Sequence, residues 1–353
     1  MARLKVSMSL LLTARQKRIL LIPLILLLAL SLTAFGCPRP VVEEPVQPAP
    51  ELVDPLDEPI EPMFITIGTG GVGGVYFPLG GGMAKIITAE IPELTATAEV
   101  TGASVANVRF IHAGEMELGF TMSCVAWDAH HGTGAFKGEH LHTLRGLFNL
   151  YPSFHHWVTL AHLPIHSVAD VVGKRISIGS PGSGTEVQAT AVIKALGYTL
   201  ADFKISRLSF VENVTALRDG VIDVGVWTGG AGIASIIDIA TTHDIRIIPF
   251  SREELARIFE VLPYYPQGVL PAGTYPGVDI DVPMPTVGNL IVVHQDLPYR
   301  VAYEILSSIF DNLDVLRGIH VAAYFIALET GPLTAIPLHP GAERFFRDRG
   351  VIP

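Results

Sequence analysis

The sequence predicts an α/β fold made of two similar halves. The first observation is internal repetition. "NVRFIHAGEMELGFT" (107–121) aligns without gaps on "NVTALRDGVIDVGVW" (213–227), and "ITIGTGGVGG" (65–74) aligns on "ISIGSPGSGT" (176–185). The second is alternation, because each half reads as strand, glycine turn and helix, followed by a helix that ends at Gly114 or Gly220 before another strand. This order is typical of a parallel sheet with helices on both faces, whose ligands bind at the carboxyl ends of the strands.

The first 37 residues predict a secretory signal. Five basic residues precede an apolar run over 19–35, and Gly36 and Cys37 follow. The small residue before Cys37 resembles the lipobox of bacterial lipoproteins, although Ala34 stands where that pattern usually has Leu. We therefore expect lipidation at Cys37, with an uncleaved membrane anchor as the alternative. Both place the rest of the chain outside the cytoplasm, in the periplasm or at the cell surface, tethered to a membrane.

Residues 38–62 predict a linker. This stretch holds eight prolines and seven acidic residues among twenty-five, a composition that cannot bury a core. Without residues 1–37 the chain has 19 basic and 34 acidic residues, a net charge of −15, which excludes nucleic acid as a partner. Cys124 is then the only cysteine besides Cys37, so no disulfide is expected within the mature domain, and its apolar surroundings predict a small buried side chain.

The first glycine turn contains GxGxxG at Gly68, Gly70 and Gly73. In a dinucleotide-binding fold the helix begins near the second glycine, which would place Pro78 inside its first three turns. The sequence instead predicts a longer loop and a helix that begins near Phe77, with Pro78 in its first turn. We expect no nucleotide and no other cofactor.

The second glycine turn predicts an anion site. Ser183 and Glu186 form a capping box at the start of the helix that ends before Gly197, and no GK[ST] ending follows the glycines. A glycine loop that leads into a helix presents unpaired backbone N–H groups, which suit a carboxylate. The alternative is that Ser183 and Thr185 only cap the helix.

Five motifs in order resemble one family. "GTGGVGGVYFPLGGGMA", "TGASVANVRFI", "GSPGSGTE", "LRDGVIDVGVWTGG" and "PLHPGAERFFRDRG" are similar to the TAXI solute-binding proteins of tripartite ATP-independent periplasmic (TRAP) transporters. The resemblance implies a type II periplasmic binding fold with two lobes and a ligand cleft. It also implies a monomer that captures a small carboxylate or amino acid, similar to glutamate or 2-oxoglutarate, and delivers it to the TRAP membrane permease.

Mapping these motifs onto the chain predicts a ligand site and lobe limits. Lobe 1 is expected over 63–150 and about 255–353, and lobe 2 over 151–254, with a long helix over 298–316 packed on lobe 1. For Tyr76 and Trp227 the alternative is a place in the core, and for Asn107 it is a structural role shared with Asn213. The expected site residues are Thr69, Gly70, Gly71, Tyr76, Thr101, Ser104, Asn107, Ser183, Gly184, Thr185, Trp227 and Thr228.

Two other classes of function, a metal-ion receptor and an enzyme, have weaker support in the sequence. Clustered histidines (130 and 131, 140 and 142, 155 and 156) suggest a metal-ion receptor as the alternative. Adjacent histidines in a strand point to opposite faces, however, so no metal site is expected. Ser183 is the only serine in a glycine elbow and does not satisfy GxSxG, so no catalytic residue and no enzyme activity are expected.

Overall fold

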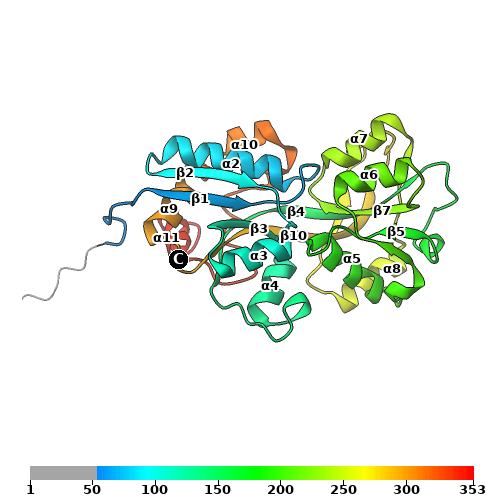
Figure 1. Cartoon of the computed structure of the whole chain (residues 1–353), viewed down its shortest axis with the longest axis horizontal. Coiled ribbons are helices and arrows are strands. Elements are labelled where there is room, and N and C mark those ends of the chain that lie inside the picture. The colour runs from blue at the N-terminus through cyan, green and yellow to red at the C-terminus, as the bar shows by residue number, and fades with distance from the viewer. Residues whose placement is uncertain (1–53) are drawn as a thin grey trace, which may run out of the picture. The chain divides into compact units, whose positions relative to one another are not determined.

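Residues 54–353 are described by the computed structural model. Their strands form one ten-stranded sheet in the order β2-β1-β3-β10-β4-β7-β5-β6, with β8 on β4 and β9 on β10 (Figure 1). The expected signal segment, lipidated Cys37 and most of the linker lie outside these described residues. No helix between residues 54 and 353 combines the length and the apolar character needed to cross a bilayer.

The strands and helices have the following bounds. The strands are β1 (Met63–Gly68), β2 (Leu94–Glu99), β3 (Leu118–Met122), β4 (Leu144–Leu160), β5 (Arg175–Ser177), β6 (Lys204–Ser206), β7 (Val224–Gly229), β8 (Ile245–Ile247), β9 (Gln267–Leu270) and β10 (Val282–His294). The helices are α2 (Tyr76–Glu90), α3 (Ser104–Ala113), α4 (Ser123–His131), α5 (Gly184–Ala195), α6 (Phe210–Arg218), α7 (Ala234–Thr242), α8 (Arg252–Val261), α9 (Tyr299–Asp311), α10 (Leu313–Ile319) and α11 (Pro340–Asp348). Four short 3₁₀ helices join them at 134–136, 169–171, 200–202 and 321–325.

The internal repeat is present in the structure. β1 pairs in parallel with β2 and β3, and β5 pairs in parallel with β6 and β7. The Asn107 amide donates to the Phe120 carbonyl at 2.8 Å, and the Asn213 amide donates to the Val226 carbonyl at 3.2 Å. Both ends of this bond are displaced by the 106 residues that separate the aligned stretches. The two halves therefore share a hydrogen bond between helix and strand as well as a topology.

The sheet is parallel within each half, as predicted, but not in its middle. β4 and β10 lie in the middle of the sheet, pair with each other along most of their length, and run antiparallel to β7 and β3 (Figure 1). The first part of β4 pairs with the end of β10, which itself pairs with β3, whereas residues 154–158 of β4 pair with β7. These two long strands join the halves, and they run antiparallel because one leaves the first half and the other returns to it.

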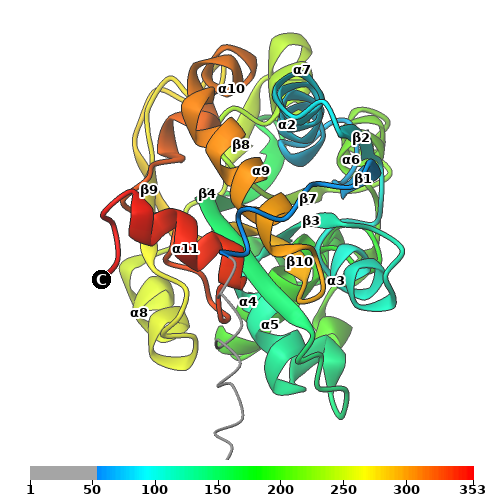
Figure 2. The ribbon, with the colours of Figure 1, turned by 90° about the vertical axis from the view of Figure 1, so that its left-hand side faces the viewer.

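Helices cover both faces of the sheet. In the first half, α2 and α10 lie on one face, and α3 and α4 on the other (Figures 1 and 2). α2 begins at Tyr76, which confirms that Pro78 lies in the first turn. Its buried side includes Leu79, Met83 and Ile87, and the helix packs against β2, α9 and α10. Cys124 is a buried free cysteine on α4, as predicted.

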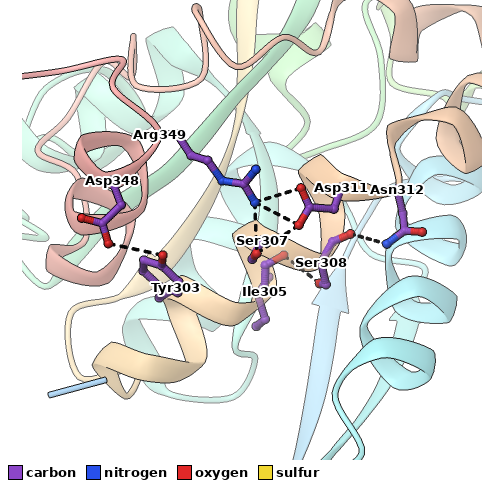
Figure 3. Close-up of polar contacts among 8 residues, drawn as sticks. All are labelled: Tyr303, Ile305, Ser307, Ser308, Asp311, Asn312, Asp348 and Arg349. Atoms are coloured by element: carbon purple, nitrogen blue, oxygen red, sulfur yellow. Dashed lines mark hydrogen bonds and ion pairs between the residues drawn. The ribbon is translucent and has the colours of Figure 1, made fainter. Parts of the chain in front are cut away.

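The expected long helix over 298–316 is two helices. α9 ends at Asp311 because the backbone leaves the helical conformation at Asn312. The Asn312 backbone N–H donates to the Ile309 carbonyl at 3.2 Å. The Asn312 side-chain amide donates to the Ser308 carbonyl at 2.9 Å (Figure 3). Arg349, which directly follows α11, donates to Asp311 at 2.8 Å, so the ends of α9 and α11 are joined at the break (Figure 3). The expected packing on the first half holds, since α9 contacts α2 and β4.

The end of the expected linker is attached to the folded unit. Asp54 forms a 3.2 Å ion pair with Arg344, and Arg300 donates to the Glu58 carbonyl at 2.7 Å. Ile60 is partly buried against the core. Within the described residues the chain is therefore anchored from Asp54 onward, earlier than the predicted start of the fold at residue 63.

Candidate functional site

One cavity lies between the two halves of the sheet. It holds about 590 Å³ of empty space, including the space open to solvent at its mouth. Nine of the twelve expected residues line it: Gly70, Gly71, Tyr76, Thr101, Ser104, Ser183, Gly184, Thr185 and Thr228. The structure thus brings together loops from both halves that the repeat placed at the carboxyl ends of strands.

Four helices begin at this cavity. The first residue of α2, α3, α5 and α6 lines it in each case: Tyr76, Ser104, Gly184 and Phe210. The N-terminus of a helix carries about half a positive charge and unpaired N–H donors. α2 and α3 also begin without a capping side chain. The cavity wall therefore contains four helix N-termini, and none of its lining residues is Lys, Arg or His.

Three arginines of the two halves, Arg109, Arg145 and Arg207, do not line the cavity. Arg109 pairs with Glu139 at 2.7 Å, and Arg207 pairs with Glu186 at 2.5 Å. Arg145 donates to the His142 carbonyl at 2.6 Å.

Ser183 caps α5 as predicted, but the predicted capping box is not reciprocal, because Glu186 bonds Gly182 instead of Ser183. The Ser183 hydroxyl accepts the Glu186 backbone N–H at 3.1 Å, and the Glu186 carboxylate accepts the Gly182 N–H at 3.0 Å. Because Ser183 accepts in this bond, its own hydroxyl proton remains available to an acceptor in the cavity. Capping and ligand contact are therefore compatible at Ser183.

The two halves touch across the cavity. The Val105 N–H donates to the Gly182 carbonyl at 3.1 Å, and the Ser235 N–H donates to the Gly73 carbonyl at 3.3 Å. Gly184 packs so tightly that a Cβ there would overlap Met122 Sδ and lie 2.7 Å from Ser104 Oγ. Two backbone hydrogen bonds therefore join the halves, and Gly184 packs where a side chain would overlap its neighbours.

Three expected site residues lie outside the cavity lining. Thr69 is fully buried, and its hydroxyl donates to the Glu99 carbonyl at 2.5 Å. The Asn107 amide nitrogen lies within 3.0 Å of the carbonyl oxygens of Gly68, Thr69 and Phe120, so it holds the first glycine loop to β3. This arrangement matches the structural alternative for Asn107.

Trp227 is the third expected site residue that lies outside the cavity lining. Its side chain is fully buried, and its indole N–H donates to the Ser235 hydroxyl at 3.0 Å. Ser235 in turn makes the backbone contact with the first glycine loop described above. Trp227 therefore supports the closed cleft from the core of the second half.

The adjacent histidines of β4 are buried and neutral. Burial lowers the pKa of His155 to about 3, with a further contribution from His156, whose own pKa burial lowers to about 4. The Trp157 indole, which can only donate, lies 2.9 Å from His155 Nε2, so the His155 proton is on Nδ1 and points to the Thr228 hydroxyl at 2.9 Å. Thr228 accepts this bond, which leaves its hydroxyl proton for an acceptor in the cavity.

The second histidine forms a similar chain. The His156 Nδ1–H donates to the Trp227 carbonyl at 3.2 Å, and Nε2 accepts the Tyr275 hydroxyl at 3.2 Å. Among the described residues no group of three His, Cys, Asp or Glu side chains is placed to hold a metal ion.

Several lining residues were not among those predicted, including Ala103, Met122, Tyr151, Ser209 and Phe210. The repeat could have found Phe210, because it aligns with the expected residue Ser104 at the same 106-residue offset. Ala103 has a φ of 69°, the only positive value outside glycine in residues 54–353. Such strain is concentrated at functional loops.

Two similar α/β halves, joined by crossing strands and enclosing a cavity, define the fold of the periplasmic solute-binding proteins. The chain belongs to the NMT1-like family, whose sequence profile matches residues 67–350.

Three solved structures are similar to this chain, and one of them, with a TM-score above 0.5, supports this fold. PhnD1 from Prochlorococcus marinus (MIT 9301), in complex with methylphosphonate, is 13% identical, with 83% of this chain and 100% of that chain covered and a TM-score of 0.51. The alkanesulfonate-binding protein SsuA from Xanthomonas axonopodis pv. citri, bound to MOPS, is 14% identical, with coverages of 82% and 85% and a TM-score of 0.49. A TctC solute-binding protein from Polaromonas is 12% identical, with coverages of 74% and 86% and a TM-score of 0.42.

Proposed function

We propose that this protein is an extracytoplasmic solute receptor of a TRAP transporter, of the TAXI type. It captures a small carboxylate or amino acid, similar to glutamate or 2-oxoglutarate, and delivers the ligand unchanged to the membrane permease. The observation that carries the proposal is the convergence of four helix N-termini on one cavity without a cationic side chain. Backbone dipoles and hydroxyl donors bind an anion in such a place.

The proposed residue roles follow from the donors. Ser183 and Thr185, with the first N–H groups of α5, hold one anionic group of the ligand. Thr228 and Ser104 add hydroxyls, and Tyr76 supplies a ring on the first half. The loops are held in place by three residues outside the cavity lining, Thr69, Asn107 and Trp227.

Capture is proposed to occur by lobe closure. The lobes would meet at the two backbone hydrogen bonds across the cavity and move apart by bending of β4 and β10. We assign the segment from α8 to the start of β10 to lobe 2, because α8 packs on α5 and β9 pairs with residues 282–285. The return to lobe 1 then lies later in the chain than residue 255. A ligand that contacts both lobes stabilises the closed state by its greater affinity for it.

Thermal unfolding of the protein, expressed with its own N-terminal segment, tests this function. The panel holds L-glutamate, 2-oxoglutarate, other C4 to C6 carboxylates, amino acids, methylphosphonate and divalent cations. A true ligand at 100 times its Kd stabilises the folded state by about 2.7 kcal/mol, which raises Tm by about 5 °C for a domain of this size.

The pattern of responses separates the classes. A shift with carboxylates or amino acids supports the proposal. A shift with methylphosphonate alone would assign a different anion to the same cavity. A shift with divalent cations alone, reversed by a chelator, would support a metal receptor instead.

A further inference from the structure

Tyr151 lies at the cavity on β4, one of the two strands that join the halves. Its side chain is 1% exposed and lines the cavity. The ring is fixed by packing, because a Cβ at Gly230 would come within 3.1 Å of Tyr151 Cε2. The Asn289 side-chain amide donates to the Tyr151 carbonyl at 2.8 Å and holds the backbone as well.

The Tyr151 hydroxyl has no hydrogen-bond partner among the described residues. A buried polar group without a partner is strongly unfavourable, and native proteins keep few of them. Tyr151 nevertheless belongs to the wall of a cavity. A partner that arrives with the ligand would satisfy it.

The neighbouring tyrosine shows which kind of partner is needed. The Tyr76 hydroxyl donates to Asn289 Oδ1 at 2.5 Å, and the Asn289 amide nitrogen is committed to the Tyr151 carbonyl and to Ser153 Oγ at 2.7 Å. Tyr76 has therefore used its only proton and can offer the cavity an acceptor alone. The proton of Tyr151 is free, and burial raises its pKa well above 10, so the hydroxyl keeps that proton at neutral pH.

We propose that Tyr151 is a specificity-determining residue, whose hydroxyl donates a hydrogen bond to an oxygen atom of the bound ligand. This inference rests on the proposed function of the cavity and adds a residue that the sequence motifs do not indicate. The Tyr151 hydroxyl favours ligands that place a carboxylate or carbonyl oxygen against β4. Ligands that end there in an aliphatic group leave the hydroxyl unpaired and bind more weakly.

The test is Tyr151→Phe, compared with Tyr275→Phe as a matched control. Tyr275 is equally buried, lies outside the cavity lining, and its hydroxyl is paired with His156 and the Ile233 N–H. Affinity is measured by calorimetry with L-glutamate, 2-oxoglutarate and methylphosphonate, for each probe that raises the Tm of the wild-type protein. Tm is measured without ligand for all three proteins.

The inference predicts that Tyr151→Phe changes the affinity and that Tyr275→Phe changes the stability. Tyr151→Phe weakens binding about tenfold and leaves the Tm without ligand equal to or above that of the wild type. Tyr275→Phe lowers the Tm and leaves the affinity unchanged. Unchanged affinity of Tyr151→Phe for a probe that the wild-type protein binds would overturn the inference.

The thermal measurement separates this inference from the proposed function. If the wild-type protein responds to none of the probes, the proposed ligand class is wrong. The Tm of Tyr151→Phe without ligand then tests the inference about the Tyr151 hydroxyl. A fall of more than about 2 °C in Tyr151→Phe means that the hydroxyl is paired within the protein and overturns the inference. An equal or higher Tm supports a free donor.

Discussion

Replacing Gly184 with alanine tests whether closure of the cleft depends on this residue. Gly184 is the first residue of α5 and packs against Met122 and Ser104 of the first half, where a methyl group would overlap Met122 Sδ and lie 2.7 Å from Ser104 Oγ. Overpacking of a closed contact costs about 1–3 kcal/mol. This strain is absent when the lobes separate, so it penalises the closed state alone. The affinity of the ligand is therefore expected to fall by about 5-fold to 150-fold.

Calorimetry gives the affinity, and small-angle X-ray scattering gives the radius of gyration with and without ligand. The expected result is weaker binding and a larger radius of gyration than the wild-type protein shows at the same ligand concentration. Gly81→Ala is the control, because Gly81 lies in α2 with nothing within 4 Å of its Cβ position. This change is expected to stabilise the helix slightly and leave affinity unchanged. If Gly184→Ala binds and contracts like the wild type, closure does not proceed through this contact.

Two further predictions concern the cradle and the buried histidines. Ser183→Ala with Thr185→Ala is expected to weaken binding about 30-fold, since two polar contacts of about 1 kcal/mol each are lost, whereas Ser251→Ala, which removes an equivalent cap from α8, changes stability without changing affinity measured by calorimetry. Equal losses of affinity in both would show that the cradle is elsewhere. The folded-state pKa of His155 is about 3 and that of His156 about 4, both below the ordinary 6.5, so between these values the unfolded chain binds more protons and stability falls as pH decreases. Urea denaturation should show a loss of about 4 kcal/mol between pH 7 and pH 5, and a flat profile over that range would contradict neutral buried imidazoles.

The repeat predicted much of the fold because it preserves local signals. Glycines at the helix ends, the capping serine of α5 and Pro78 in α2 each fix a local geometry, and these features were predicted from a few neighbouring residues. The antiparallel course of β4 and β10 was not predicted, because strand direction in the middle of a sheet depends on partners far along the chain. The break between α9 and α10 was missed because Asn312 fits an amphipathic pattern until its side chain takes a backbone carbonyl.

The candidate site was predicted in part for the same reason. Loop residues after repeated strands, such as Gly70 and Thr185, line the cavity because topology places them there. Asn107 and Trp227 were expected in the same place, but a polar or aromatic residue near a loop can equally face the core. Tyr151 could not be predicted from the sequence, because it lies within a long apolar strand and only the fold brings that strand to the cavity.

The structure of the protein with its bound ligand tests the central claim most directly. The account predicts an anionic group within hydrogen-bond distance of the first backbone N–H groups of α5 and of the Ser183 or Thr185 hydroxyl, with no arginine or lysine side chain in contact. A ligand neutralised by a cationic side chain, or one bound away from the four helix N-termini, would contradict it.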